Sequence, residues 1–530
     1  WRDTVKRPSK TRVLGMMTIA GFLAIASSAQ AQQVTLKSSD GTVNMTGDLI
    51  AFEDNTYILR TALGQLRLAA NRVSCSGEAC PDLSQEDVDI AMSGSEEIGS
   101  GLMPILLEGY AGAKNAAATL RNTGLGNQLV ANLVNDEGFG EELASFQVTG
   151  TSATEGLGDL LDKTSDIAIT SRRIVPQEAQ AFGATGAGDM YSPAQEHIVA
   201  VDSLVVITNP DNPITTLNVR QLFGIYSGAI TNWSQLGGPD LPVQVVIRDV
   251  GENRRDAFES SFFGSADVAL TQKAEIVADS NSVAQFVNQN DGAIGVVGYA
   301  FQRGARTVNI INQCGITMVP DAFSAKTEEY ALQRRLYLYT RGDTITPEIR
   351  NFVNWASSAG ADGVISKAGF IGFNVDRREQ SNSDVRAIAM QNAEGTPLEK
   401  AVMRQMLEKM VEYDRLSTTF RFQTGSALLD ERGQIDKARL VEYLETQPAG
   451  SEVLFVGFTD SVGGFEYNQT LAERRAAEVM GSVGSFARKR LADLTMSSIG
   501  YGEVAPSGCN ASDQGRRINR RTEVWIEWPT

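Results

Sequence analysis

Histidine and cysteine are scarce in this chain, which has one histidine and four cysteines among 530 residues. Zinc, haem and iron–sulfur sites are built from clusters of these side chains, so their scarcity argues against a metal or redox centre. The one histidine, His197, begins an apolar stretch with no nucleophile motif beside it, which favours a structural role. We therefore expect a protein with no catalytic residue, no metal and no cofactor.

Basic residues and long apolar runs are also in short supply. The chain has 47 lysines and arginines against 64 aspartates and glutamates, and its formal net charge of −17 would repel nucleic acid. Beyond residue 31 no segment is long and uncharged enough to span a bilayer. Hydrophobic residues make up 42% of the chain, which is typical of globular proteins, and the length suits three or four domains.

The first 31 residues have the three parts of a secretory signal peptide. Basic residues come first, residues 13–26 are uncharged and largely apolar, and Ala29, Gln30 and Ala31 form a small-x-small cleavage motif. We expect residues 1–31 to be removed after Ala31 and the protein to be exported. The alternative is a retained N-terminal anchor.

Residues 33–81 alternate apolar and polar side chains between turn signals, which predicts a small antiparallel β module. Cys75 and Cys80 lie near its end, and an oxidising compartment favours a disulfide between them, with two free thiols as the alternative. Cys314 and Cys509 fall in different predicted domains, which favours two unpaired cysteines and leaves a bridge between them open.

In the region 91–375, short apolar strands such as 166–169, 203–207 and 244–247 alternate with amphipathic helical stretches. This order predicts parallel sheets packed between helices, and the length is sufficient for two lobes. A cleft between the lobes is the expected ligand site.

Hydroxyl and glycine residues gather ahead of predicted helices in this region, around residues 99–101, 149–152, 170–173 and 248–253. Such loops can present backbone N–H groups, hydroxyls and guanidinium groups to a tetrahedral oxyanion. Serine and threonine before a helix also serve as ordinary N-caps, so each loop has this second interpretation.

The segments 166–172, 196–202, 222–238 and 293–300 resemble the phosphate-binding proteins of ABC importers. The resemblance covers roughly residues 95–375 and implies a two-lobed periplasmic-binding-protein fold of type II, closing on phosphate or a similar small oxyanion. By position it implies six anion-binding residues, which are Ser100, Thr151, Ser152, Ser171, Arg172 and Arg248.

The sequence departs from this family directly after Arg248. The family follows its arginine with a Gly-Ser-Gly-Thr loop, whereas residues 251–254 of this chain are Gly, Glu, Asn and Arg. Glu252 would replace a hydroxyl donor with a carboxylate, which repels phosphate unless it points away or pairs with an arginine. The ligand is therefore left open between phosphate, another anion, a mixed-charge ligand and none.

Residues 376–414 begin with a polar stretch and continue into a helical pattern, so we expect a linker and a helix there. The rest of the chain, residues 415–528, has strand patterns at 420–422, 452–456 and 522–526. Helical patterns around 435–445 and 471–483 lie between these strands, which indicates a second α/β unit.

Asp460 and Arg475 are the candidate binding residues of this C-terminal unit. Asp460 lies on a loop after a predicted strand and Arg475 in the first turns of the following helix, so both can face one pocket. An acid and a guanidinium held near each other suit the ammonium and carboxylate of an amino acid. An ordinary surface ion pair is the alternative.

Four segments here, residues 422–426, 457–463, 468–476 and 515–524, resemble the OmpA-like peptidoglycan-binding domain. The resemblance implies an α/β sandwich that binds the diaminopimelate of the peptide stem without cleaving it. By position it implies that Asp460 takes the ammonium and Arg475 the carboxylate, with Asn468 and Thr459 bracing the loop. The family usually has histidine where Phe458 stands, and residues 520–521 match its terminal arginine motif.

Together these features predict a multidomain α/β protein of the periplasm of a Gram-negative bacterium, bound to peptidoglycan in the cell envelope. Two hypotheses remain for the central domain. In the first, it captures an oxyanion and passes it to an ABC importer. In the second, the cleft is degenerate and the protein is a structural or adhesive link between the wall and another envelope component, such as one in the outer membrane.

Overall fold

The structure is a computed structural model, and it describes residues 33–37, 44–53, 56–62, 64–69, 73–77, 79–81, 88–123, 127–136, 142–248, 270–422 and 431–529. The chain divides into two compact units, residues 1–82 and 83–530. The predicted signal peptide lies outside the described residues. Within the described part of the chain, no helix combines the length and apolar character needed to cross a membrane.

The first unit contains a five-stranded antiparallel sheet in the order β4-β3-β2-β1-β5. Alternate residues of its strands form a small core that includes Val34, Leu36 and Tyr57. A disulfide joins Cys75 to Cys80, with 5.8 Å between their Cα atoms, and such a bond stabilises a module whose own core is small. The strands are β1 (Gln33–Lys37), β2 (Asn44–Glu53), β3 (Thr56–Thr61), β4 (Gly64–Ala69) and β5 (Ser74–Ser76).

The central domain of the second unit is built on one mixed sheet in the order β14-β13-β15-β11-β19-β10-β6-β9-β8-β7. Its two lobes share the 13-residue strand β11, which pairs with β19 in one half and with β15 in the other. The first-lobe and crossover strands are β6 (Ile90–Ser95), β7 (Ala116–Asn122), β8 (Gln128–Asn135), β9 (Glu142–Thr151), β10 (Ile167–Thr170), β11 (Glu196–Thr208) and β19 (Gln333–Thr340).

The second lobe adds the parallel strands β13 (Gln244–Arg248), β14 (Glu275–Val277) and β15 (Ala293–Gly298), with the short strand β16 (Arg306–Thr307) on β11. A small separate sheet has the order β12-β17-β18. Its strands are β12 (Thr216–Asn218), β17 (Asn309–Ile311) and β18 (Thr317–Met318). The two-lobed α/β fold expected from the sequence is therefore confirmed. The sheet is not parallel throughout as predicted, because β11 pairs antiparallel with both β15 and β19.

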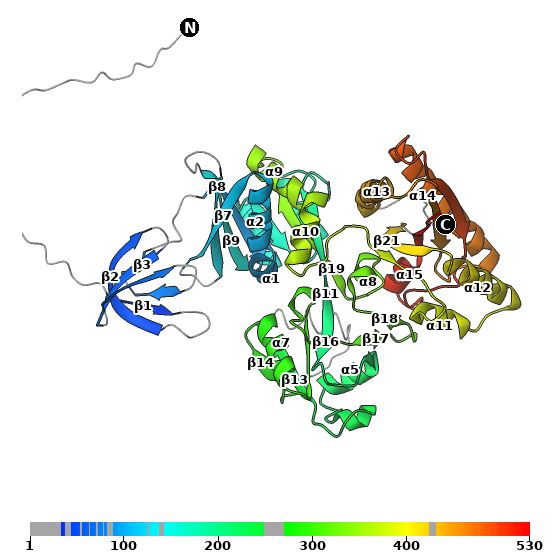
Figure 1. Cartoon of the computed structure of the whole chain (residues 1–530), viewed down its shortest axis with the longest axis horizontal. Helices are drawn as coiled ribbons and strands as arrows, with labels where there is room; N and C mark the ends of the chain where they lie inside the picture. Colours follow the sequence, from blue (N-terminus) through cyan, green and yellow to red (C-terminus); the bar gives the residue numbers. More distant parts are fainter. Residues whose placement is uncertain are drawn as a thin grey trace, which may run out of the picture. The chain divides into compact units, whose positions relative to one another are not determined.

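Helices cover both faces of the first-lobe sheet. In Figure 1, α2, α9 and α10 lie together beside β7 to β9, and α3 packs on β6 and β10. The central helices are α1 (Glu96–Gly101), α2 (Met103–Ala113), α3 (Ala153–Asp162), α4 (Pro176–Ala184), α5 (Val219–Tyr226), α7 (Ser280–Gln289), α8 (Ala322–Lys326), α9 (Pro347–Ala356) and α10 (Ala359–Lys367), with 3₁₀ turns η2 (Trp233–Leu236) and η3 (Tyr299–Phe301).

The C-terminal domain is a sheet in the order β20-β21-β24-β22-β23 with helices on both faces. One face packs against α13 and α14, and the other against α11 and α12. Its strands are β20 (Arg377–Arg378), β21 (Asp414–Arg421), β22 (Glu452–Phe458), β23 (Thr495–Gly500) and β24 (Arg521–Glu527). Its helices are α11 (Val385–Gln391), α12 (Pro397–Met410), α13 (Glu431–Leu444), α14 (Phe465–Ala487) and α15 (Asp513–Asn519).

The segment 376–414, expected as a linker and a helix, folds as part of this domain. Its strand β20 pairs with β21, and its helices bury Met390, Val402 and Met406 against the sheet. Part of its polar composition serves helix capping, since Thr396 accepts a hydrogen bond from the backbone N–H of Glu399 at 3.3 Å. A polar run therefore marks helix ends here and not a linker alone.

The central and C-terminal domains meet in a seam with an unusual concentration of buried charge. Glu328 contacts Arg432 at 2.6 Å and Arg517 at 3.0 Å, and Glu329 contacts Arg415 at 2.8 Å. Burial alone would raise the pKa values of Glu328 and Glu329, but the facing arginines outweigh it and hold both well below the ordinary value. Both carboxylates therefore remain ionised inside the protein.

A disulfide crosses the same seam. Cys314 of the second lobe is bonded to Cys509 of the C-terminal domain, with 5.5 Å between their Cα atoms. The sequence favoured two unpaired cysteines here, because they belong to different domains, and left a bridge between them open. That expectation was wrong because the domains pack against each other and bring two cysteines 195 residues apart into contact.

Candidate functional site

The candidate binding site of the C-terminal domain lies where β22 leaves the sheet. Asp460 follows the strand in a loop before α14, and only 9% of its surface is exposed. One carboxylate oxygen, Oδ2, accepts a hydrogen bond from Nη1 of Arg520 at 2.7 Å. The other, Oδ1, accepts one from the backbone N–H of Val462 at 3.2 Å. The loop thus holds the carboxylate in a fixed position near the protein surface.

Arg475 comes from the buried face of α14, and 1% of its surface is exposed. Its guanidinium lies 5.1 Å from the centre of the Phe422 ring. Burial lowers the pKa of Arg475, the neighbouring charge of Arg520 lowers it further, and Asp460 opposes both. These mutual effects place Asp460, Arg475 and Arg520 in one electrostatic cluster, and an arginine remains protonated in such a setting.

Asn468 and Thr459 both make hydrogen bonds that fix the loop around Asp460. Asn468 donates from Nδ2 to the backbone carbonyl of Asp460 at 3.3 Å and to the carboxylate of Glu503. The backbone N–H of Thr459 donates to the carbonyl of Gly502 at 2.9 Å, which ties the loop to the end of β23. Gly502 has φ +63° and passes close to α14, where a side chain would be strained.

Glu503 also belongs to this site, although no motif in the sequence indicated it. It contacts Asn468, and burial raises the pKa of its carboxyl, with Glu399 and Asp460 adding to the rise. Only its position after the tight turn at Gly502 could have indicated that it folds back toward Asp460. The site therefore combines two carboxylates with two guanidinium groups, a set that suits a ligand with both an ammonium and a carboxylate.

The two neighbouring arginines of the terminal motif have different positions. Arg520 faces Asp460, while Arg521 is fully buried and donates to Glu523 at 2.8 Å and to the carbonyl of Ala505 at 2.9 Å. The guanidinium of Arg521 lies 4.1 Å from the ring centre of Phe458, which is itself fully buried. Phe458, where the family usually has histidine, therefore belongs to the core beneath the pocket.

In the central domain, each predicted arginine ligand has a carboxylate partner within the protein. Arg248 contacts Glu97 at 2.6 Å across the two lobes. Arg172 contacts Glu178 at 2.6 Å and also donates to Thr154 at 3.0 Å, both within the first lobe. Each guanidinium would therefore have to leave its carboxylate partner before it could bind a ligand.

The predicted hydroxyl ligands do not gather around these arginines. Ser100 lies inside α1, where its hydroxyl donates to the carbonyl of Glu96 at 2.7 Å, so the glycine-rich loop expected at 99–101 is helical instead. Ser152 caps α3 and accepts from the backbone N–H of Glu155 at 3.1 Å. The hydroxyl of Thr151 lies 3.2 Å from that of Ser93. Ser171 alone among the four predicted hydroxyl residues lines a pocket with Arg172.

Glu97 is the centre of the network between the lobes. Its Oε1 accepts hydrogen bonds from Nη1 of Arg248 at 2.6 Å and from the hydroxyl of Ser280 at 2.9 Å. Its Oε2 accepts one from Nη2 of Arg334 at 2.8 Å, and Arg334 also contacts Asp202 at 2.7 Å. Burial alone would raise the pKa of Glu97, but Arg334 and Arg248 outweigh it and lower the pKa to about 2.

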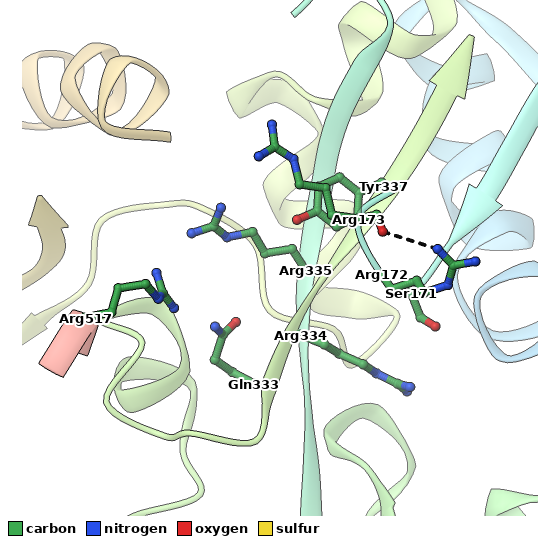
Figure 2. Close-up of a pocket in the computed structure, with 8 residues that line it drawn as sticks. All are labelled: Ser171, Arg172, Arg173, Gln333, Arg334, Arg335, Tyr337 and Arg517. Atoms are coloured by element: carbon green, nitrogen blue, oxygen red, sulfur yellow. Dashed lines mark hydrogen bonds between the residues drawn. The ribbon is translucent and has the colours of Figure 1, made fainter. Parts of the chain in front are cut away.

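Figure 2 shows an arginine-rich pocket of about 350 Å³ around the start of β19. Arg334 and Arg335 point to opposite sides of this strand, as successive strand residues do. Every arginine in the pocket has an acidic partner; Arg173, for example, contacts Glu196 at 2.8 Å. The lining residues are Ser171, Arg172, Arg173, Gln333, Arg334, Arg335, Tyr337 and Arg517.

Two predicted features fall outside the described residues. These are the loop after Arg248, which includes Glu252, and residues 423–430, which include most of the first motif of the C-terminal domain.

The buried histidine, His197, lies 3.4 Å from the hydroxyl of Thr340, and burial lowers its pKa to about 4. A neutral, buried ring of this kind fits the structural role expected for it.

Comparison with known protein families finds two matches along the chain. Residues 109–359 match a model described as PBP superfamily domain, and residues 421–520 match a model described as OmpA family. The two family resemblances expected from the sequence motifs are thereby confirmed.

Individual relatives divide in the same way. The phosphate-binding protein PstS of Borreliella burgdorferi is 24% identical over 235 residues, which cover 43% of this chain and 79% of that protein. Outer membrane porin F of Pseudomonas aeruginosa is 30% identical over 154 residues, which cover 29% of this chain and 39% of the porin. The crystal structure of an ABC-type phosphate transport receptor from Vibrio cholerae shares 24% identity, with a TM-score of 0.39 over 53% of this chain and 99% of the receptor.

Proposed function

Because this chain joins a PBP superfamily domain to an OmpA family domain, we propose that it is an exported, non-enzymatic protein held on peptidoglycan in the cell envelope. The C-terminal domain would bind the diaminopimelate of the peptide stem. The expected signal peptide supports export, and the match to the OmpA family supports association with the wall.

The observation that carries this proposal is the cluster of Asp460, Arg475 and Arg520 at the carboxyl end of β22. Asp460 would accept hydrogen bonds from the ligand's ammonium, and Arg475 would donate to its carboxylate. Because Arg475 is almost fully buried and Asp460 is bonded to Arg520, both groups are positioned before the ligand arrives. Little side-chain entropy is then lost on binding.

Co-sedimentation with purified sacculi tests the proposal on the full chain. Asp460→Asn and Arg475→Lys keep the size of each group but remove its charge or its forked geometry, so each should weaken binding roughly tenfold or more. Arg474→Ala is the matched control, because Arg474 is exposed on the same helix. If both Asp460→Asn and Arg475→Lys pelleted with sacculi as strongly as wild type does, the assignment of these residues to peptidoglycan binding would be refuted.

For the central domain, one candidate function is capture of an oxyanion and its delivery to an ABC importer. The relatives named phosphate-binding proteins support it. The second candidate is a structural link in which the cleft no longer takes a solute, with another envelope component as partner. The pairing of Arg248 with Glu97 and of Arg172 with Glu178 favours this second function. Calorimetric titration of the full chain with phosphate and sulfate separates the two, since only the first predicts binding heat.

A further inference from the structure

We propose that the carboxylate of Glu97 is an internal ligand, which takes the place of an oxyanion between the two lobes and keeps phosphate out of the cleft. The inference deepens the second function proposed for the central domain. It does not depend on the binding of peptidoglycan by the C-terminal domain.

The partners of Glu97 form the donor set that an oxyanion would require. Two guanidinium groups and one hydroxyl, from Arg248, Arg334 and Ser280, converge on its two oxygens at 2.6–2.9 Å. They come from β13, β19 and the first residue of α7, while Glu97 comes from the first turn of α1. Charge-assisted bonds of this length are strong, and they use both oxygens of the carboxylate.

The position of Glu97 follows from the way β6 runs into α1. Gly94 has φ +144°, and a side chain there would collide with the backbone of Ile169, so glycine lets β6 lie against β10 at this point. The helix then begins at Glu96, which places Glu97 one residue into its first turn. The side chain extends from the first lobe to donors in the second lobe and on the crossover strand β19.

The charges of this network are already balanced without a ligand. The two positive charges of Arg248 and Arg334 face two acidic side chains, Glu97 and Asp202. An entering phosphate would either add negative charge beside Glu97 or displace it from all three of its donors. Both routes cost free energy, because like charges repel strongly where water is largely excluded and a buried charge that loses its partners is penalised.

The pair formed by Arg172 and Glu178 is different in one respect. It joins two residues of the same lobe, only six positions apart, so it cannot hold the lobes together. The bonds of Glu97 to Arg248 and Ser280 join positions 151 and 183 residues apart. Glu97 therefore replaces a ligand in two ways. It accepts the hydrogen bonds that an oxyanion would accept, and it joins the two lobes.

The test compares the full-length wild type with Glu97→Ser and Glu97→Gln by calorimetry and thermal shift, with phosphate and with sulfate. Glu97→Ser vacates the donors and leaves the site with an excess positive charge, so we expect saturable anion binding at least roughly tenfold tighter than in wild type. Glu97→Gln removes the charge at nearly constant size and should show a smaller gain. Glu96→Ser is the control, since Glu96 is the exposed neighbour in the same turn and its replacement should leave the wild-type result unchanged.

Two results would overturn the inference. One is binding of phosphate by the wild type as tightly as by Glu97→Ser. The other is the absence of any gain in a Glu97→Ser or Glu97→Gln variant whose circular dichroism matches that of wild type. Pelleting of the same variants with sacculi keeps this test separate from the proposed wall binding, because Glu97 variants should pellet as wild type does even where their anion binding changes.

Discussion

Glu97 remains ionised in a largely buried position because two guanidinium groups face it. Its side chain is 14% exposed, and its neighbours are Arg248, Arg334 and Ser280, with Asp202 behind Arg334. The fall of its pKa from an ordinary 4.5 to about 2 corresponds to a stabilisation of at most about 3 kcal/mol. A carboxyl whose pKa is lower in the folded state stabilises that state at every pH above its unfolded-state pKa. This stabilisation is lost as the pH falls toward the folded-state pKa.

The corresponding prediction concerns the thermal unfolding midpoint as a function of pH. Wild type should unfold at a higher temperature than Glu97→Gln at neutral pH, and the difference should shrink as the pH falls from about 4.5 to about 2. Differential scanning calorimetry of both proteins over this range provides the measurement. A difference that stays constant across the whole range would show that Glu97 is not held ionised by its neighbours.

At the residue scale, the sequence predicted that Asp460 and Arg475 belong to one site, but it did not indicate the network around Glu97. Asp460 and Arg475 stand in motifs of fixed spacing, so their roles could be predicted by position. The partners of Glu97 lie 151 to 237 residues away in sequence, and no local pattern indicates such pairings. Glu97 itself lies beside a predicted loop, but its charge gave no reason to include it among anion ligands.

At the scale of elements, the turn after α8 is the key contact between the central and C-terminal domains. It places Glu328 and Glu329 side by side against β21, α13 and the segment around α15. Glu328 adopts a left-handed backbone conformation, with φ +59°, and is 2% exposed. Several arginines depend on this one carboxylate, since Arg335, Arg432 and Arg517 all contact it.

We predict that Glu328→Gln destabilises the protein by about 3–5 kcal/mol. The change removes the charge that faces the buried Arg421 and Arg432, and it also takes a partner from the more exposed Arg335 and Arg517. Thermal unfolding would show a lower midpoint, and hydrogen–deuterium exchange would show faster exchange in residues 327–330. Glu379→Gln is the control, since Glu379 is an exposed acid of the C-terminal domain. Equal unfolding midpoints for Glu328→Gln and the control would mean that the buried charges between the two domains contribute little to the stability of the fold.

Elements were predicted from the sequence where the apolar pattern was strong. The strand patterns at 452–456 and 522–526 fall within β22 and β24, and the pattern at 420–422 overlaps the end of β21. The two helical patterns fall within or overlap α13 and α14. Glycine and serine misled at 99–101, because the residues before them already form a helix that continues through Gly101. Propensity is a weak guide where tertiary packing on β9 and α2 fixes the backbone.

At the scale of the whole molecule, the disulfide between Cys314 and Cys509 is the largest difference from expectation. A bond that closes a loop of this length restricts the unfolded chain strongly and typically contributes about 2–5 kcal/mol. Replacing both cysteines with serine should therefore lower the unfolding midpoint of residues 83–530. The Cys75→Ser, Cys80→Ser pair is the control, because it belongs to the other compact unit.

Peptide mapping without reduction provides the direct readout for this bond. The account predicts a linked peptide pair that contains Cys314 and Cys509 and no reactive thiol from either residue. Recovery of both cysteines as free thiols from protein isolated under oxidising conditions would contradict it. Sequence alone could not give this pairing, since it depends on how two separately recognisable domains pack.

We propose above all that the C-terminal site holds the protein on peptidoglycan, with Asp460 bound to the ammonium and Arg475 to the carboxylate of diaminopimelate. Calorimetric titration of the full chain with a soluble stem peptide that ends in diaminopimelate tests it most directly. We predict saturable binding to wild type and affinity lower by roughly tenfold or more for Asp460→Asn and for Arg475→Lys. Equal affinity in all three proteins would contradict the claim.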